Sequence, residues 1–415
     1  MITRRRLLET PGVGAMLAGL GLAFPRMFTT EAEAQPILNL SPMLPEGTRS
    51  EAILDTLPGK KPLIKLSYRP PNYESPIGYL GTVITPNDAF FVRYHLSDIP
   101  QIDARTWNLA IGGDGANGAI RLTLRELRQL PAFEVVAVCQ CSGNRRGLFQ
   151  PHVAGVEWGY GAMGCARWKG ARLKDVLDIV GFKKETIEIV FDGADDPAVD
   201  KTPDFVKSIP VWKALEETTL VAYEMNGEPL PHWNGFPARI VVPGWTGTYW
   251  VKHLTSITVA TKPFDGYWMK SAYRIPLGKF PVVARFTSQE TAVNTPITEM
   301  VVNSLITSHS DGASVKAGAN LVVAGIAWDG GYGISSVEVS IDGGKTWTAA
   351  VLGKDDLGQF AFRAWSYGFA PRTRGKHVVM ARATNKIGQG QTTTLIPNPA
   401  GYHHNVVQTV TLVAT

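Results

Sequence analysis

The spacing of apolar and polar residues changes at about residue 285, and this change predicts two structural regions. In the first region, short apolar runs such as Leu220–Tyr223 and Ile240–Val242 are typical of buried strands. Helical periodicity appears in Leu122–Leu130 and Leu173–Val180, and loops rich in glycine and proline separate these segments. Because strands and helices do not alternate as βαβ units, the pattern favours an α+β fold over a Rossmann fold.

The second region has the pattern of an all-β domain. Leu321–Trp328 is an apolar run, Val337–Ile341 alternates apolar and polar residues, and Asp342–Gly344 is a hairpin turn signal. Further strands are expected at His377–Thr384 and Val406–Leu412. Short strands at this spacing, with no helical pattern between them, predict an immunoglobulin-like β-sandwich over residues 285–415.

The N-terminal residues 1–34 have the pattern of a secretory signal. Three arginines precede leucines in Thr3–Leu8, a weakly apolar stretch spans Gly12–Phe24, and Ala32–Ala34 is a small-x-small exit. Paired arginines beside leucines indicate the twin-arginine route, which exports folded proteins to the periplasm. Residues 35–78 are rich in proline and predict an extended arm before a catalytic domain at residues 79–284.

Composition narrows the class of protein. With 44% hydrophobic and 19% charged residues and a net charge of +5 over 415 residues, the chain resembles an ordinary globular protein. Lysines and arginines are scattered, which gives no support for nucleic-acid binding. No later stretch approaches the run of about 20 apolar residues that spans a bilayer. We therefore expect a periplasmic protein without a membrane span.

The chain has three cysteines, a small and odd number that argues against a disulfide framework. Cys139 and Cys165 are interpreted as core residues. No Cys-x-x-Cys-His sequence occurs, so we expect no haem in this chain. Cys141 stands apart because Arg145 and Arg146 follow it closely, and fixed positive charge favours thiolate over thiol. A thiolate is a nucleophile and a soft metal ligand, although a buried inert cysteine is the alternative.

Several longer motifs occur together in one order. They are Phe91–His95, Cys141–Arg146, Trp158–Ala162, Ala166–Leu173 and Tyr223–Pro231 continuing to Lys252. In this order they resemble the sulfite oxidase family of molybdenum enzymes over roughly residues 60–415. Within that family, the chain is most similar to the catalytic subunits of bacterial periplasmic sulfite dehydrogenases. The resemblance implies a molybdopterin-binding domain followed by a domain that often makes a dimer contact.

The resemblance also implies roles for individual residues. Cys141 would bind molybdenum, which also carries one molybdopterin, a pyranopterin. The catalytic residues implied are Arg93, His95, Cys141, Arg146, Trp158 and Tyr273. The cofactor-binding residues implied are Phe91, Val92, Arg93, Tyr94, His95, Cys141, Asp195, Asn234, Arg239, Trp250, Val251 and Lys252. Arginine suits a sulfite pocket because guanidinium binds oxyanions through paired hydrogen bonds.

Two departures from vertebrate members of the family affect this interpretation. Asn234 stands where they have a histidine before Gly-Phe-Pro, and Pro397–Gly401 stands where they have Trp-Asn-x-Arg-Gly. A third pocket arginine is therefore in doubt. Vertebrate members also carry a haem domain, for which the region before residue 79 is too short.

The resemblance implies oxidation of sulfite to sulfate, with water as the oxygen source and a c-type cytochrome as the electron acceptor. The cytochrome would be a bound subunit or a separate protein, which leaves open a homodimer or a heterodimer. Rival functions are a sulfane dehydrogenase, a reductase of nitrate, sulfoxide or another oxo compound, and a non-enzymatic exported binding protein.

Overall fold

The structure is a computed structural model that describes residues 37–39, 51–277 and 293–415. The expected signal peptide, residues 1–34, and the expected domain boundary after residue 284 lie outside the described residues. No helix in the described part of the chain is long and apolar enough to cross a bilayer.

Two sheets form the body of the first region. One has the order β13-β12-β9-β8 with β14 also paired to β12, and the other has the order β11-β10-β15-β6-β7. The first comprises β8 (Ala132–Gln140), β9 (Met163–Arg172), β12 (Leu220–Met225), β13 (Glu228–Pro229) and β14 (Arg239–Val241). The second comprises β6 (Asn108–Gly112), β7 (Ile120–Thr123), β10 (Glu188–Gly193), β11 (Lys207–Pro210) and β15 (Leu254–Ala260). Both strands predicted in this region are confirmed. The strand predicted at residues 220–223 lies within β12, and the bounds of the strand predicted at residues 240–242 differ from those of β14 by one residue.

The helices are few and short. They are α1 (Leu124–Leu127), α2 (Leu173–Val180), α3 (Val211–Ala214) and α4 (Tyr267–Lys270), with 3₁₀ turns η1 (Ile77–Leu80), η2 (Asn87–Ala89), η3 (Arg146–Leu148), η4 (His232–Asn234) and η5 (Gly247–Tyr249). The helix predicted at residues 173–180 is confirmed as α2. The helix predicted at residues 122–130 is wrong at residues 122 and 123, which belong to β7 and pair with β6. Only one helical turn, α1, remains of the predicted helix.

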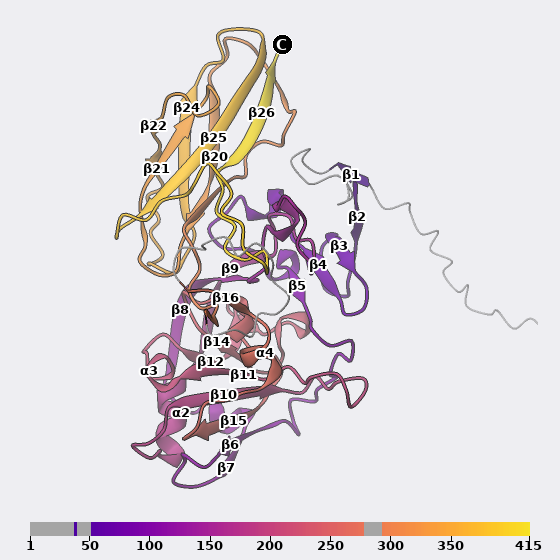
Figure 1. Ribbon diagram of the computed structural model, residues 1–415, viewed down its shortest axis with the longest axis vertical. Coiled ribbons are helices and arrows are strands. Elements are labelled where there is room, and N and C mark those ends of the chain that lie inside the picture. Colours follow the sequence, from indigo (N-terminus) through magenta and orange to yellow (C-terminus); the bar gives the residue numbers. More distant parts are fainter. Residues whose placement is uncertain (1–36, 40–50, 278–292) are drawn as a thin grey trace, which may run out of the picture. The chain divides into compact units, whose positions relative to one another are not determined.

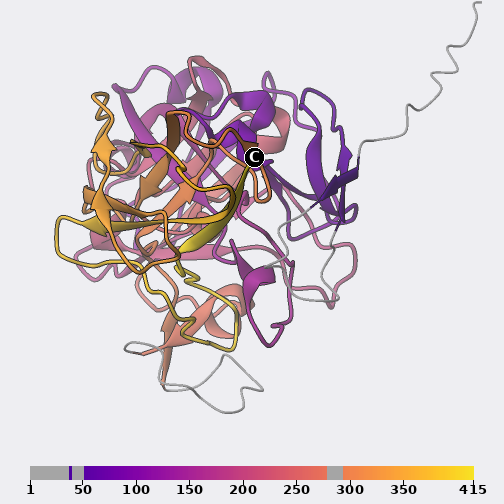
Figure 2. The same ribbon diagram turned by 90° about the horizontal axis from the view of Figure 1, so that it is seen from above.

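The proline-rich arm is built into a sheet. Strands β1 (Ile37–Asn39), β2 (Glu51–Asp55), β3 (Leu63–Ser67) and β4 (Asn72–Glu74) continue in order to β5 (Val92–Arg93). Figure 2 shows these indigo strands lying beside one another. The predicted boundary at residue 79 falls inside η1. The arm therefore shares a sheet with the motif at residues 91–95, with Asn72 opposite Arg93.

The C-terminal region consists of two further sheets (Figure 1). One has the order β18-β20-β24-β23 and the other β19-β26-β25-β21-β22. Their strands are β18 (Asn303–Ile306), β19 (Ser314–Val315), β20 (Leu321–Trp328), β21 (Ile334–Ser340), β22 (Thr348–Ala349), β23 (Val351–Leu352), β24 (Arg363–Phe369), β25 (Gly375–Asn385) and β26 (Gln408–Ala414). Buried residues from both sheets, such as Val323 and Val379, form one core. A separate antiparallel pair, β16 (Arg274–Pro276) and β17 (Asn294–Pro296), precedes it.

The ends of β8 and β9 pack against this domain. Trp328 Nε1 donates to Gln140 Oε1 at 2.7 Å, and one apolar cluster combines Val136 and Val138 of β8 with Leu305 and Trp328. Gln140 directly precedes Cys141, so the C-terminal domain holds the strand end that presents this cysteine.

Candidate functional site

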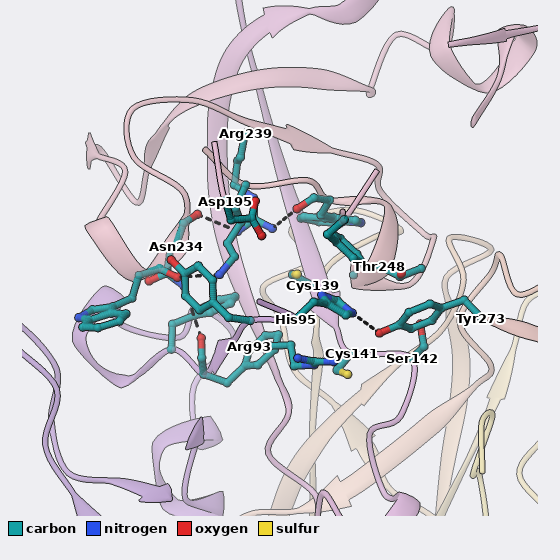
Figure 3. A pocket seen from close by; sticks show the side chains of 18 residues that line it. Arg93, His95, Cys139, Cys141, Ser142, Asp195, Asn234, Arg239, Thr248 and Tyr273 are labelled. Carbon is teal, nitrogen blue, oxygen red and sulfur yellow. Dashed lines mark hydrogen bonds between the residues drawn. The ribbon is translucent and has the colours of Figure 1, made fainter. Parts of the chain in front are cut away.

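A pocket of about 670 Å³ brings together residues from both halves of the first region. Of the fifteen residues predicted from the sequence, eleven line it: Phe91, Arg93, Tyr94, His95, Cys141, Asp195, Asn234, Arg239, Trp250, Lys252 and Tyr273. Figure 3 shows Cys141, Arg93, His95 and Tyr273 on one side of the pocket and Asn234, Asp195 and Arg239 on the other.

The remaining four predicted residues lie beside the lining. Val92, Val251 and Trp158 are buried in apolar clusters, with Trp158 in the same cluster as Cys141. Arg146 is also buried, next to the C-terminal segment rather than in the lining. Eleven of the fifteen thus line one pocket and the other four are buried outside its lining, and the individual roles of all fifteen stay predictions.

Cys141 is placed by a tight turn at the end of β8. Its backbone N–H donates to Ala162 O at 2.9 Å, and its carbonyl accepts from the Asn144 N–H at 2.9 Å. The Asn144 side chain accepts from the Ala162 N–H at 3.0 Å, and Ser142 Oγ donates to Thr246 Oγ1 at 2.9 Å. These bonds explain why small and amide residues follow Cys141, because each closes the turn that presents the thiol to the pocket.

Arg93 is oriented by the arm. Its Nη1 donates to Asn72 Oδ1 at 3.1 Å, and Asn72 Nδ2 donates in turn to Ser67 Oγ at 2.7 Å. Since Asn72 and Arg93 face each other across β4 and β5, the register of the sheet sets the direction of the guanidinium. The side chain of Arg93 lines the pocket together with Cys141 and Tyr273.

His95 and Tyr273 form a hydrogen-bonded pair in the pocket wall. The His95 ring stacks on Phe205 with centroids 3.6 Å apart. Burial, reinforced by the positive charges of Arg93, Lys252 and Lys207, holds the pKa of His95 well below its usual value. Burial raises the pKa of Tyr273. Both groups are therefore neutral near pH 7, and each can donate or accept one hydrogen bond.

The two arginines after Cys141 point to different partners. Arg145 is fully buried, donates from Nη1 to Asn303 Oδ1 at 2.7 Å and from Nη2 to Ser304 O at 2.9 Å, and so joins the C-terminal domain. Arg146 donates from Nε to Ala400 O at 3.0 Å. Of the two arginines, only Arg146 lies beside pocket residues. Arg145 and Arg146 therefore have different surroundings although they are adjacent in the chain.

A second cluster of charge lies at the other side of the pocket. Arg239 donates to Asn234 O and to Trp250 O, each at 2.9 Å. Lys252 lies over the Tyr94 ring, and burial holds the pKa of its ammonium well below the usual value. Burial raises the pKa of Asp195 to about 6 even though Lys252 opposes the shift. This side can supply cations together with an acidic acceptor.

Sequence reasoning missed several residues that the fold brings to the site. The lining also includes Phe90, Cys139, Ser142, Phe205, Trp233, Gly247 and Thr248. Cys139 is buried as predicted, and burial raises its pKa to about 11, but it also borders the pocket. Cys165 is a buried core residue as predicted.

Two buried lysines were also missed. Lys207 lies over the rings of Tyr249 and Tyr273 and donates to Trp268 O at 2.6 Å. Lys60, from the arm, donates to Asn234 Oδ1 at 2.6 Å. Single lysines in the sequence carry no signal for burial, so only long-range contacts reveal them.

The arrangement is suited to an anionic ligand that also contacts a thiol. Arg93 and Arg239 place fixed positive charge around one cavity, Lys252 adds a basic amine, and Cys141 supplies a soft donor. The cations lie on both sides of the pocket, which suits a long ligand with an anionic group at one end and a metal at the other.

Two family models match the chain in succession. Residues 95–268 match the oxidoreductase molybdopterin binding domain, and residues 294–413 match the Mo-co oxidoreductase dimerisation domain. The first contains most of the pocket, and the second covers the C-terminal sheets.

Full-length relatives agree with these matches. The chain is 36% identical over 319 residues to mitochondrial sulfite oxidase of Rattus norvegicus, covering 75% of this chain and 57% of that protein. It is 34% identical over 318 residues to sulfite oxidase of Arabidopsis thaliana, covering 73% of this chain and 79% of that protein. The crystal structure of the sulfane dehydrogenase SoxCD from Paracoccus pantotrophus superposes with a TM-score of 0.69 at 27% identity, covering 83% and 84% of the two chains.

The pocket fits the molybdenum cofactor of such proteins. Thr248 Oγ1, a buried hydroxyl of the lining, has no hydrogen-bond partner within the described residues, as expected where a polar ligand completes the site. Cys141 would supply a thiolate to the metal, and Arg239 and Lys252 would face the anionic end of the pterin. By the succession of both domain models and by its identity to sulfite oxidases over most of its length, the chain belongs to the sulfite oxidase family of molybdenum oxidoreductases.

Proposed function

We propose that this protein oxidises sulfite to sulfate. The reaction takes one sulfite and one water to one sulfate, two protons and two electrons. The observation that carries the proposal is the shared pocket of Cys141 and Arg93, with Arg146 beside it, because this places a metal-binding thiol next to donors for a small oxyanion. The matched relatives named sulfite oxidase support the choice of substrate.

When bound, the molybdenum cofactor supplies a two-electron redox centre able to transfer an oxygen atom to sulfur. The protein residues bind and orient. Arg93 and Arg146 hold the sulfite oxygens, and the neutral His95–Tyr273 pair adds hydrogen bonds without adding charge. Trp158, fully buried in the same apolar cluster as Cys141, contributes to the apolar packing behind the site.

The two electrons leave to an external acceptor. We infer that a c-type cytochrome accepts them, that this chain holds no haem, and that the protein works in the periplasm after twin-arginine export. The basic, leucine-containing start of the sequence supports the export route. The domain model over residues 294–413 supports a homodimer formed through the C-terminal domain.

That domain is also inferred to be of the immunoglobulin type. The strand orders β18-β20-β24-β23 and β19-β26-β25-β21-β22 correspond to the two sheets of such a domain, with one extra strand at each edge of the second sheet. A parallel pairing of β19 with β26 accompanies the otherwise antiparallel second sheet. The domain organisation proposed is thus an arm, a catalytic domain and a sandwich.

A second candidate, sulfane oxidation, is favoured by the superposition on SoxCD. The pocket residues that bind the cofactor would be shared by both activities, so the difference lies in the substrate. Sulfite is a compact dianion, whereas a sulfane sulfur is carried on a larger molecule.

Purified protein separates these candidates. We expect sulfite-dependent reduction of ferricyanide and of cytochrome c, with one molybdenum per chain. The same assay with a small persulfide in place of sulfite tests the second candidate. Turnover of the persulfide alone would contradict sulfite oxidation, and protein free of molybdenum and inactive on every substrate would favour the binding protein considered from the sequence.

A further inference from the structure

The loop Asn398–Tyr402 encloses the guanidinium of Arg146. Ala400 O accepts from Arg146 Nε at 3.0 Å, and Arg146 Cζ lies 5.2 Å from the centroid of the Tyr402 ring. The loop is held in shape by the Asn398 side chain, which donates to Tyr402 O at 2.6 Å and accepts from the Tyr402 N–H at 3.0 Å.

Three glycines pack so closely against Arg146 that a side chain at any of these positions would clash with it. A methyl group at Gly143 or at Gly155 would lie 2.6 Å from Arg146 Nη1, and one at Gly401 would lie 2.9 Å from Arg146 Cγ. Gly155 and Gly401 also have positive φ values, +135° and +61°. Three segments of the chain therefore fit closely against one side chain.

Tyr402 connects this enclosure to the pocket. Its ring stacks on Tyr273 with centroids 5.8 Å apart and an interplanar angle of 10°. Tyr273 in turn bonds to His95 and lines the pocket with Arg93 and Cys141. Tyr402 is 5% exposed, so its ring is fixed between Arg146 and Tyr273.

We propose that Tyr402 is a positioning residue that holds the guanidinium of Arg146 in place for sulfite binding. This inference rests on the proposed function. A ring over a guanidinium restrains it without neutralising its charge. The substrate therefore meets the two arginines Arg93 and Arg146, and the ring of Tyr402 restrains the second of them.

The test compares four variants with the wild type in sulfite oxidation: Tyr402→Phe, Tyr402→Leu, Arg146→Gln and the double variant Tyr402→Leu with Arg146→Gln. We expect Tyr402→Leu to raise KM for sulfite by about two- to thirtyfold with a smaller change in kcat, since a cation–π contact has about this strength. Tyr402→Phe keeps the ring and should keep KM near the wild-type value. The double variant should match Arg146→Gln alone, because both changes disturb one group.

Tyr367→Leu is the control, because Tyr367 stacks on Phe369 within β24, in the C-terminal domain. If Tyr402→Leu does not accumulate as folded protein, Tyr402→Met fills similar space without a ring and takes its place. Equal defects in Tyr402→Phe and Tyr402→Leu would overturn the proposal, since the hydroxyl would then matter rather than the ring. An additive double variant would also overturn it.

Calorimetric titration with sulfate separates this inference from the proposed function. If the wild type does not oxidise sulfite, the proposed function fails, but sulfate can still report on Arg146. The proposal then requires weaker sulfate binding in Tyr402→Leu and unchanged binding in Tyr402→Phe. Equal sulfate affinity in the wild type and Tyr402→Leu would overturn it.

Discussion

Lys60 Nζ lies 2.6 Å from Asn234 Oδ1, although 174 residues separate the two in the chain. The same amine donates to Asn87 O at 2.6 Å, and Lys60 is only 6% exposed. Asn234 lines the pocket. Two residues of the arm therefore hold side chains of the site. Lys60 donates a hydrogen bond to the Asn234 amide, and Asn72 accepts one from Arg93.

The first prediction follows from the burial of Lys60, which lowers its pKa to about 7. The unfolded chain holds this proton up to about pH 10.4, so it binds more protons than the folded chain between pH 7 and 10. Folding is thereby favoured as the pH rises through this window, and the gain is lost as the pH falls toward 7. Lys60→Met removes the titration.

Urea unfolding at pH 7 and pH 10 measures this effect. The free energy of unfolding of the wild type, relative to Lys60→Met, should rise between the two pH values by up to about 4 kcal/mol. Lys61→Met is the matched control, because Lys61 is a half-exposed neighbour paired with Asp88. A pH-independent difference between wild type and Lys60→Met would show that Lys60 is charged throughout.

The second prediction separates the neighbouring arginines. Arg145→Met should lower the free energy of unfolding by about 2–4 kcal/mol, because it removes buried hydrogen bonds to Asn303 and Ser304. Its KM for sulfite should stay near the wild-type value. Arg146→Gln should show the reverse pattern, with raised KM and a smaller loss of stability. Thermal unfolding and steady-state kinetics on both variants check this, and exchanged effects would refute the assignment.

The third prediction concerns Arg93. Arg93→Gln should raise KM for sulfite by about ten- to a hundredfold, since a charge-assisted hydrogen bond contributes about 1.5–3 kcal/mol. Arg121→Gln serves as the control, because Arg121 is an exposed arginine of β7 that bonds to Asn108. Saturation by sulfite that is unaltered in Arg93→Gln would remove Arg93 from the substrate site.

Local pattern was enough to predict some elements. The range 321–328 coincides with β20 and 173–180 with α2, because an apolar run and a periodic helix face are visible in neighbouring residues. At residues 120–123 the pairing with β6 prevailed over helical spacing. The arm has no periodicity in its sequence, yet its strands pair in order with one another and with β5, a long-range arrangement that no local pattern predicts.

The site shows the same division. Motif order identified Cys141 and the residues 91–95, and eleven predicted side chains line one pocket. Lys60, Lys207 and Tyr402 were not identified, because each reaches the site through the fold rather than through a motif. The sequence departure at residues 397–401 marked where a change occurs, but only the structure shows Tyr402 beside Arg146.

The fourth prediction concerns electron transfer. The purified chain should contain molybdenum and pterin, show no haem absorption, and reduce cytochrome c at a rate that falls with ionic strength, as charge-steered encounters do. Absorption and metal analysis, with stopped-flow kinetics across a salt series, check this. A haem band from this polypeptide, or hydrogen peroxide formed in proportion to sulfite consumed, would contradict it. Rates independent of salt would point to a permanently bound partner.

The most direct test of the account is the turnover of sulfite by Cys141→Ser with ferricyanide as acceptor. Cys165→Ala is the control, because Cys165 is fully buried in a different apolar cluster. Serine replaces the soft thiolate with a harder and more basic ligand, so Cys141→Ser should fold and lose sulfite turnover while Cys165→Ala keeps most of it. Turnover by Cys141→Ser close to that of the wild type would contradict the assignment of Cys141 as the metal-binding thiolate.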